Sequence, residues 1–526
     1  MIDDLTMCFR YFTGLRDYLR KTLSPEECRQ RIQRQLSDRS HSFLRILERG
    51  IYANPRSPYA RLLKHAGIDH STIASQVNQE GVEKALERLY DAGVYITFEE
   101  FKGRRPVQRP GLEFAVRPED FDNPLLERDY ELRSGGSRGV GTRIIVDFDL
   151  LTHEAAYHFL SIECLNVRNR PVAIWYGVPP VVNGMKHVLR NAKIGHPIEM
   201  WFSQSRLSLR PETLKYFVFT NYALYASRLF GAPLPSPQHT PLEQARKVAG
   251  WLAAKKSSGN PGELHTNPSS GVRVCLAAKE HGLDISGSFF RFNSEPYTPA
   301  KARIVAETGS RAAVQYSLAE IGNIGMACGN PAALDDVHLL TDKLAVIQRE
   351  KRLLNSTVSV GALLYTTLLP SCPKLMLNVE SDDYGRLERR RCGCLLSEMG
   401  FEQHLSQIRS YDKLTSEGMT FMGSELITLI EDLLPEQFGG NPTDYQLVEE
   451  EEGGLPKISV IVSPRVGAID DEAVIRAVLS RLGSYPGCKN MMTEVWKDGQ
   501  TLRVVRREPF VTGAAKILPL HILRSP

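Results

Sequence analysis

The stretch Ser134-Gly-Gly-Ser-Arg-Gly-Val-Gly-Thr142 decides how the rest of the sequence is interpreted, because it holds four glycines and three hydroxyl side chains. Glycine lets successive backbone N–H groups turn towards one point, where an anion such as a phosphate satisfies them. Serine and threonine hydroxyls add donors to the same oxygens. The sequence therefore predicts a phosphate loop at residues 133–142, with a surface hairpin that binds nothing as the alternative.

Strands are predicted on both sides of this loop. Ile144–Phe148 is short and β-branched, a composition typical of strands. The segment before the loop, Arg128–Leu132, is polar with one aromatic residue, and it predicts a second strand. A Walker A loop requires Gly-Lys-Ser/Thr followed by a helix, and the stretch has neither. We therefore expect a strand–loop–strand clamp.

Length, charge and cysteine usage predict a cytoplasmic protein of more than one domain. A chain of 526 residues exceeds what one hydrophobic core usually serves. The net charge of +4 is too small to favour nucleic acid or an anionic membrane as a partner. Asp3, Asp4 and Arg10 interrupt the apolar start, so no signal peptide is expected. Nine unevenly spaced cysteines indicate a reducing cytoplasm rather than disulfides.

The first 115 residues predict a helical lead-in. Ser24-Pro-Glu-Glu27 has the pattern of a capping box with proline at the first helical position. Apolar residues at helical spacing continue from there to about Arg49. The segments around Ser57–Tyr59 and Glu83–Tyr90 indicate further short helices.

After the glycine loop, strand and helix patterns alternate, which is typical of α/β layers with parallel or mixed sheets. The predicted strands are Val172–Tyr176, Phe217–Phe219 and Phe289–Phe292, and the predicted helices are His153–Leu165, Tyr222–Leu229 and Val272–His281. Thr240 is expected to open one more helix through a capping box, and Thr298 to cap another. The stretch Leu353–Pro373, which has no charged residue, suits two buried strands.

The end of the chain predicts a smaller α+β unit. Ser424 is expected to cap a helix, followed by strands at Tyr445–Glu449 and Lys457–Val462 and a helix at Asp471–Leu482, with a hairpin turn at Glu449–Gly454. A break at Ser410–Lys413 precedes these elements. The expected fold is thus a large layered α/β domain with mixed sheets over residues 1–408, and a small mobile α+β domain over residues 409–526.

Three cysteines and one histidine have the donor types of a structural zinc site. They are Cys328, His338, Cys392 and Cys394. Three thiolates and an imidazole make a closed tetrahedral set; buried free cysteines beside a surface histidine are the alternative. The remaining cysteines have no such neighbours in the sequence and are expected in the core (Cys8, Cys28, Cys164, Cys275, Cys372 and Cys488).

The order of the motifs resembles that of the adenylate-forming superfamily of acyl-CoA and acyl-protein ligases, most closely the phenylacetate–CoA ligase branch. The resemblance covers about Leu44 to Ile517 and implies the fold described above. It implies phosphate contacts for Ser134, Gly135, Gly136, Ser137, Gly139 and Thr142, adenine contacts for Ser294, Glu295, Pro296, Tyr316 and Ser317, and a ribose contact for Asp383. It further implies catalytic roles for Lys516, Glu320 and Arg409, with Glu320 as a Mg²⁺ ligand, and it supports the Cys/His zinc site.

The sequence departs from the family pattern at several of these motifs. The loop carries Arg138 as an insertion and lacks the usual Gly-x-Pro-Lys/Thr ending. Ala319 stands where a Ser or Thr usually precedes the glutamate, and Ala515 where a glycine usually precedes the lysine. Tyr411 occupies a hinge position that is usually acidic. These differences bear on rates and domain rotation more than on ATP binding.

The resemblance implies activation of a carboxylic acid by ATP and Mg²⁺ as an acyl-adenylate, with pyrophosphate released. The acyl group then passes to a thiol, with coenzyme A as the first acceptor and a carrier protein or an amine as the alternatives. A nucleotide-binding relative without turnover is the competing hypothesis. The acid is expected between the segments Tyr222–Tyr225, His265–Ser269 and Asn293–Tyr297, whose composition suits an aromatic or medium-sized acid. Neither nucleic acid nor a membrane is an expected partner, and the sequence leaves a homodimer open.

Overall fold

A computed structural model of the chain describes most of its 526 residues. The described ranges are 2–126, 130–133, 143–146, 148–179, 182–205, 214–231, 233–318, 320–352, 359–410, 415–416, 419–420, 427–452, 455–483, 502–511, 517 and 519–522. The predicted phosphate loop at 134–142, Ala319, Tyr411, Ser424, Cys488 and Lys516 lie outside them. Within these ranges, no helix is both long and apolar enough to cross a membrane.

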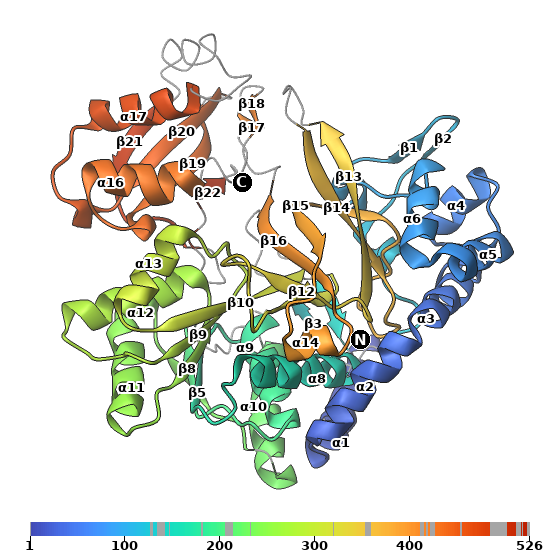
Figure 1. The fold of residues 1–526 in the computed structure, drawn as a ribbon, viewed down its shortest axis with the longest axis horizontal. Helices are drawn as coiled ribbons and strands as arrows, with labels where there is room; N and C mark the ends of the chain where they lie inside the picture. The colour runs from blue at the N-terminus through green and yellow to red at the C-terminus, as the bar shows by residue number, and fades with distance from the viewer. Residues whose placement is uncertain are drawn as a thin grey trace.

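A mixed sheet of twelve strands forms the centre of the large unit (Figure 1), in the order β13-β14-β15-β16-β12-β11-β10-β9-β8-β5-β6-β7. The six strands from β7 to β10 run parallel, and those from β10 to β13 pair antiparallel. Strands β5 and β9 are buried along their whole length, as expected for a sheet covered on both faces. This confirms the predicted α/β class with mixed pairing.

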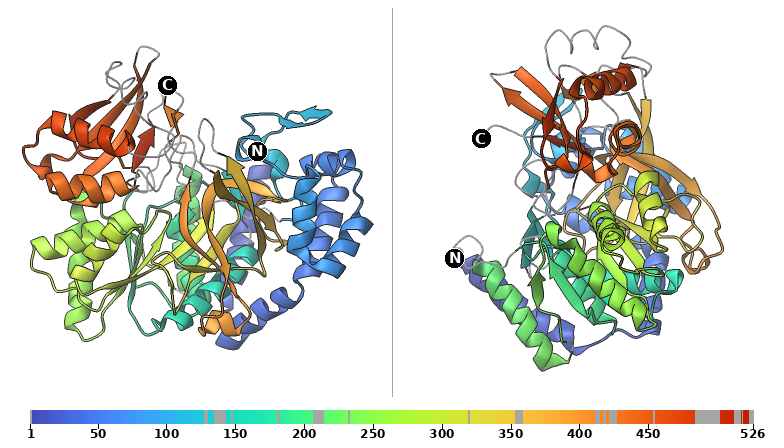
Figure 2. Two further views of the ribbon diagram at one scale, coloured as in Figure 1. Left: turned by 45° about the horizontal axis from the view of Figure 1, so that its top comes forward. Right: turned by 90° about the vertical axis from the view of Figure 1, so that its left-hand side faces the viewer.

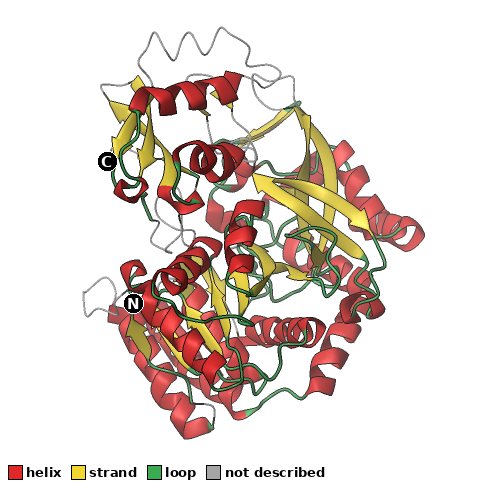
Figure 3. Ribbon diagram, turned by 60° about the vertical axis from the view of Figure 1, so that its left-hand side comes forward, coloured by secondary structure: helices red, strands yellow, loops and turns green. Residues whose placement is uncertain are grey.

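The parallel half is built from strand–helix–strand units, and helices flank the sheet on both sides in Figure 3. Its strands are β5 Val172–Trp175, β6 Met200–Ser203, β7 Pro237–His239, β8 Glu263–Thr266, β9 Phe289–Asn293 and β10 Arg311–Leu318. The helices between them are α9 Val182–Lys193, α10 Leu214–Phe230, α11 Ala245–Ser257, α12 Pro268–Glu280 and α13 Pro299–Glu307, and α8 Phe148–Leu165 precedes β5.

The antiparallel half follows directly after β10. Its strands are β11 Gly322–Ala327, β12 Val337–Leu339, β13 Leu344–Arg352, β14 Ser359–Thr367, β15 Val379–Arg389 and β16 Gln403–Ser410, with the short helix α14 Leu395–Glu398 before β16. The expectation of two strands in Leu353–Pro373 is wrong for the described part, because Ser359–Thr367 forms one nine-residue strand. That strand pairs with β13 on one side and β15 on the other.

A helical lead-in covers one side of the large unit (Figure 2). Its helices are α1 Ile2–Arg20, α2 Pro25–Ser37, α3 Arg39–Ile46, α4 Pro58–His65, α5 His70–Glu80, α6 Val82–Asp91 and α7 Phe98–Phe101, with a π-helical turn at Leu47–Tyr52 and a hairpin of β1 Val107–Arg109 and β2 Leu112–Phe114. The capping box at Ser24 is confirmed, since its hydroxyl accepts from the Glu27 N–H and the Glu27 carboxylate accepts from the Ser24 N–H. The predicted continuous helix is interrupted at Asp38, which caps α2 and precedes α3.

The strands around the glycine loop are confirmed as an antiparallel hairpin. Strand β3 Tyr130–Arg133 pairs with β4 Arg143–Val146, with Arg133 opposite Arg143. Phe148, predicted as the end of the second strand, instead begins helix α8.

Two further local predictions are wrong. Phe217–Phe219 lies inside α10, where Tyr216, Phe219 and Ala223 recur on a buried helical face rather than alternating as in a strand. Thr240 forms no capping box, because its hydroxyl donates to the Gln238 carbonyl.

The C-terminal unit has its own sheet and its own core. The strands β21 Leu502–Arg506, β20 Leu455–Val462, β19 Tyr445–Glu452 and β22 Leu520–Ile522 are ordered β21-β20-β19-β22, with helices α16 Leu434–Phe438 and α17 Asp471–Gly483. Strand β19 extends to Glu452, so Glu449–Glu452, predicted as part of a turn, belongs to the strand. The unit contacts α13 of the large unit through Lys301 and Glu431, whose Nζ and Oε1 lie 2.9 Å apart.

Gly184 offers a test of how α9 packs on the sheet. A Cβ atom at this position would lie 2.3 Å from the Gly177 carbonyl oxygen and 2.6 Å from the Trp201 ring, and neither group can rotate away cheaply. We expect Gly184→Ala to lower the free energy of unfolding by roughly 1–3 kcal/mol, measured by urea denaturation. The matched control is Gly250→Ala in α11, where a Cβ meets nothing within 4 Å. The control should be neutral or stabilising by up to about 1 kcal/mol, and equal effects in both variants would contradict this packing.

Candidate active site

The carboxyl ends of the parallel strands bring the predicted nucleotide residues to one edge of the sheet. Asn293 ends β9, and Ser317 lies one residue before the end of the adjacent β10. The Ser317 hydroxyl donates to Asn293 Oδ1 over 3.0 Å. In open α/β sheets ligands bind outside the carboxyl ends of the strands, where the strand order switches. The predicted residues therefore lie where this architecture places a ligand.

Tyr316 and Asp383 are joined directly, although 67 residues separate them. The Tyr316 hydroxyl donates to Asp383 Oδ2 over 2.6 Å and lies 3.0 Å from the Tyr365 hydroxyl. Burial and the Asp383 carboxylate raise the pKa of Tyr316 well above its ordinary value, so the phenol keeps its proton and donates. Tyr365, which the sequence did not single out, completes this hydrogen-bonded group.

The turn Ser294–Pro296 is held from two sides. The Glu295 carboxylate accepts from the backbone N–H and the hydroxyl of Ser269, over 3.0 and 2.6 Å. Asn183 at the start of α9 donates to the Ser294 hydroxyl over 3.4 Å. Ser294 has a φ of 75°, a conformation that residues other than glycine rarely adopt outside constrained sites.

Glu320 lies in the tight turn between β10 and β11 and pairs with a lysine from the helical lead-in. Lys102 Nζ lies 2.5 Å from Glu320 Oε1. Burial raises the pKa of Glu320, but the Lys102 ammonium outweighs burial and holds the pKa below its ordinary value. A buried ionised carboxylate is a suitable Mg²⁺ ligand in charge and donor type. Sequence reasoning missed Lys102 because the partners are 218 residues apart.

Arg409 lies on β16 next to Ser410, and Ser410 pairs with Asp383 of the neighbouring β15. Its guanidinium lies 3.1 Å from Asp335 Oδ2. The Asp335 carboxylate also accepts from the backbone N–H groups of Gln407 and Ile408. Asp335, a second residue missed in the sequence, thus anchors the strand segment that runs past the candidate ribose site.

Several predicted site residues lie outside the described part of the chain: Ser134, Gly135, Gly136, Ser137, Gly139, Thr142 and Lys516. Ile517, which follows Lys516, is described. Its carbonyl oxygen lies 3.4 Å from the Ser269 hydroxyl oxygen, so the C-terminal unit reaches the residue that holds Glu295.

Two of the three segments expected around the acid lie together. Parallel pairing of β8 with β9 and the Ser269–Glu295 contact join His265–Ser269 to Asn293–Tyr297. The third segment, Tyr222–Tyr225, lies on α10, which packs on α1. The Tyr222 ring contacts Phe12 and Tyr225 is 62% exposed.

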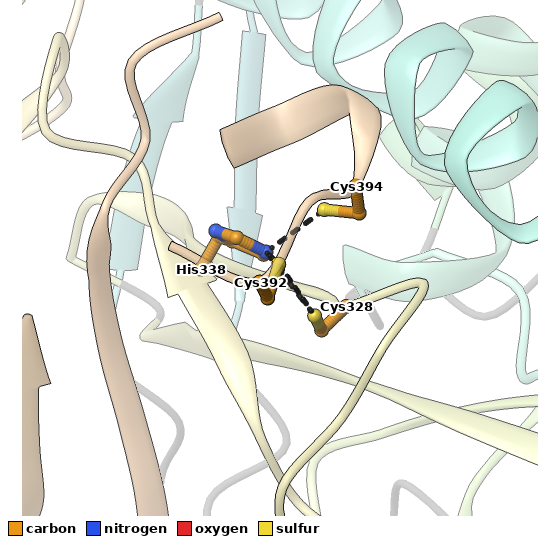
Figure 4. A group of neighbouring side chains, drawn as sticks. All are labelled: Cys328, His338, Cys392 and Cys394. Carbon is orange, nitrogen blue, oxygen red and sulfur yellow. Dashed lines mark hydrogen bonds between the residues drawn. The ribbon is translucent and has the colours of Figure 1, made fainter. Parts of the chain in front are cut away.

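The four predicted zinc ligands converge on one point (Figure 4). His338 Nε2 lies 3.3, 3.4 and 3.2 Å from the sulfurs of Cys328, Cys392 and Cys394. The other ring nitrogen, Nδ1, lies 2.6 Å from the Phe401 carbonyl oxygen, which fixes the orientation of the ring. Bonds of about 2.3 Å to sulfur and about 2.0 Å to nitrogen at tetrahedral angles separate the two donors by roughly 3.5 Å, so the residues fit zinc.

Cys164 of α8 adjoins this cluster, which corrects its assignment as an isolated core cysteine. Hydrogen bonds from the Cys164 and Cys328 thiols lower the pKa of Cys394 far below that of an ordinary thiol. Asp336 and His404 form a second group of donors around Cys328, with His404 Nδ1 2.8 Å from Asp336 Oδ1.

Comparisons with known proteins identify the fold. No protein-family model and no curated protein matches the sequence. Among solved structures, the chain is similar to 2-hydroxyisobutyryl-CoA ligase in the postadenylation state in complex with R3-HIB-AMP, with a TM-score of 0.55 and 15% identity over 96% of this chain and 91% of that one. The same ligase in complex with 2-HIB-AMP gives a TM-score of 0.53 and 16% identity over the same shares. The chain therefore has the fold of the adenylate-forming ligases, as the order of its motifs implies.

Proposed function

We propose that this protein is an ATP-dependent ligase that converts a carboxylic acid to an acyl-adenylate and then transfers the acyl group to the thiol of coenzyme A. The observation that carries the proposal is the convergence of Tyr316, Asp383 and Glu320 at the carboxyl edge of the sheet. This convergence supports the proposal because the chain shares its fold with a CoA ligase whose crystal structure contains an acyl-adenylate.

The first half-reaction joins two anions. A carboxylate oxygen of the acid attacks the α-phosphorus of ATP, the new C–O–P linkage forms, and the bond from that phosphorus to the leaving pyrophosphate breaks. The carboxylate is already ionised, so no general base is needed, and catalysis consists of neutralising charge in the transition state. Mg²⁺ held by Glu320 would supply part of that neutralisation. We assign Lys516 to the space between the carboxylate and the α-phosphate, and the loop Ser134–Thr142 to the pyrophosphate.

The nucleoside is assigned to the polar group formed by Tyr316, near the carboxyl end of β10, and Asp383, in the middle of β15. The Asp383 carboxylate can accept the two ribose hydroxyl protons while Tyr316 holds it in place. The Tyr316 ring and the Ser294–Pro296 turn are assigned to the adenine, and Arg409 to the nucleotide side of the domain boundary.

In the second half-reaction the thiol sulfur attacks the acyl carbonyl carbon, and AMP leaves. We assign residues 1–408 to the adenylating domain and residues 409–526 to a domain that rotates between the two steps. The separate sheet and hydrophobic core of the C-terminal unit support this division. The unit contacts α13 and α12 through Glu431–Lys301 and Ile517–Ser269. Transfer to a carrier protein or an amine is the second candidate, and the test is an acceptor panel after adenylate formation.

Exchange of labelled pyrophosphate into ATP across a panel of acids tests the adenylation step, and Glu320→Gln tests the assigned Mg²⁺ ligand. We expect this variant to lower Mg²⁺-dependent exchange by roughly 100-fold, about 2.7 kcal/mol of barrier, and to weaken Mn²⁺ binding followed by electron paramagnetic resonance. The control is Glu307→Gln, an exposed glutamate paired with Lys279. Full exchange activity in Glu320→Gln would remove Glu320 from the site, and exchange with none of the acids would favour a relative without turnover.

Lys516→Ala separates the two half-reactions. Loss of the ammonium should slow adenylation by at least about 100-fold, since a charged contact made in the transition state is worth several kcal/mol. Thioester formation from preformed acyl-adenylate should remain within about threefold of the parent rate. An equal loss in both half-reactions would disprove the assignment.

We also propose that Cys328, His338, Cys392 and Cys394 bind a structural zinc ion. Four protein ligands leave no open coordination position, so the ion would not contact substrate. It would join the end of β11, strand β12 and the segment after β15, which all belong to the antiparallel half of the large sheet.

Metal analysis of protein purified without chelator should find close to one equivalent of zinc. Cys394→Ala should lose the zinc and lower the melting temperature, because metal binding contributes to folding free energy. Cys28→Ala is the control, since Cys28 is fully buried in the same hydrophobic cluster and is not one of the four ligands. Less than about a tenth of an equivalent of zinc in the parent protein would show that the four side chains are only neighbours.

A further inference from the structure

Three cations converge on one buried carboxylate beneath the β10–β11 hairpin. Glu154 of α8 is fully buried. Its Oε1 lies 2.7 Å from Lys343 Nζ, and its Oε2 lies 3.3 Å from Lys186 Nζ and 4.0 Å from an Arg190 guanidinium nitrogen. Neither the predicted motifs nor the proposed catalytic groups include these residues.

The surrounding described groups leave this cluster with surplus positive charge. Among the described residues, Asp342 is a further carboxylate that interacts with Lys343, and burial raises its pKa to about 6. His158 and His187 are held neutral, because burial and the neighbouring arginine lower their pKa values. Glu263 and Arg291 balance each other at 2.8 Å. Among the described residues, three cations therefore face the two carboxylates of Glu154 and Asp342. A buried charge without a compensating partner is destabilising unless an anion joins it.

Lys186 is the member of the cluster that can meet a ligand. Its side chain is 14% exposed, whereas those of Lys343 and Arg190 are 0% and 1% exposed. If Lys186 pairs with a ligand, Glu154 still has Lys343 and Arg190 as cationic partners. Neutralising the Glu154 charge therefore does not require Lys186.

Lys186 lies on the helix that contacts one of the segments assigned to the acid. It follows Asn183 by one helical turn on α9, and Asn183 bonds to Ser294. The Nζ atoms of Lys186 and Lys343 lie 3.3 and 3.2 Å from the position of a Cβ on Gly322. Gly322 is two residues after Glu320, and the next N–H, that of Asn323, donates to Glu154 Oε1 over 3.0 Å. Helix α9 thus contacts the Ser294 turn through Asn183, and one turn later the Lys186 ammonium lies beside Gly322, two residues after Glu320.

We propose that Lys186 binds a second anionic group of the acid substrate, so that the acid activated by this protein is a dicarboxylic acid. One carboxylate would react with ATP, and the other would pair with the Lys186 ammonium through a charge-assisted hydrogen bond. The inference rests on the proposed adenylating function and specifies the substrate class of that site.

Pyrophosphate exchange with matched acids tests the proposal. The pairs are succinate with butanoate, adipate with hexanoate, and suberate with octanoate. At the best chain length, kcat/KM for the diacid should exceed that for the monoacid by at least about tenfold. Lys186→Met should remove that preference while changing the monoacid value by less than about threefold, and Lys186→Arg should retain part of it.

Lys193→Met is the matched control, because Lys193 lies two turns further along α9 and bonds to the Tyr18 carbonyl. It should leave the ratio of diacid to monoacid unchanged. Because Lys343 and Arg190 still neutralise Glu154, we expect Lys186→Met to fold, with a melting temperature close to that of the parent.

The outcomes separate this inference from the proposed function. Exchange with monoacids at least as fast as with diacids in the parent protein would overturn the dicarboxylate inference alone, whatever the variants do. An unchanged ratio in folded Lys186→Met would do the same. Exchange with no acid, while ATP and Mg²⁺ are present in excess, would overturn both.

Discussion

Strand β10 determines where the candidate site lies, because it pairs in parallel with β9 and antiparallel with β11. The chain must therefore reverse directly after β10, where Leu318 faces Gly322 across the hairpin, and Glu320 lies in that reversal. The parallel strands β5, β8 and β9 end at the same edge. Backbone hydrogen bonding alone thus brings Asn293, Ser317 and Glu320 to one place, which is where open α/β sheets hold ligands.

Buried carboxylates then fix the segments that meet there. Glu154 accepts from the Asn323 N–H, and Asp335 accepts from those of Gln407 and Ile408. A buried carboxylate without such partners would be strongly destabilising. Each carboxylate therefore orders a piece of backbone next to the site before any ligand binds, which is the arrangement that electrostatic catalysis requires.

Helix α8 connects this edge to the candidate zinc site. It carries Glu154 beneath the hairpin, and ten residues later it carries Cys164 beside Cys394. The proposed zinc ligands lie on β12, at the end of β11 and after β15, so the ion would support the antiparallel half from the side of α8. One cluster thus lies beneath the β10–β11 hairpin, and the other lies at the ends of the antiparallel strands.

The sequence by itself determined the features that depend on neighbours a few residues away: the cap at Ser24, the hairpin around the glycine loop, and the buried strands β5 and β9. The order of the motifs along the chain also pointed to Tyr316, Asp383 and the Cys/His set as candidate site residues. It misassigned Phe217–Phe219, because a short aromatic run suits a strand and a helix equally until its packing face is known. Only the tertiary structure decided that Lys102 pairs with Glu320, that Asp335 holds Arg409, and that Lys186 shares Glu154 with two other cations. The reason is physical: the partner of a buried charge is set by distance and desolvation in the folded chain, and no local spacing encodes either.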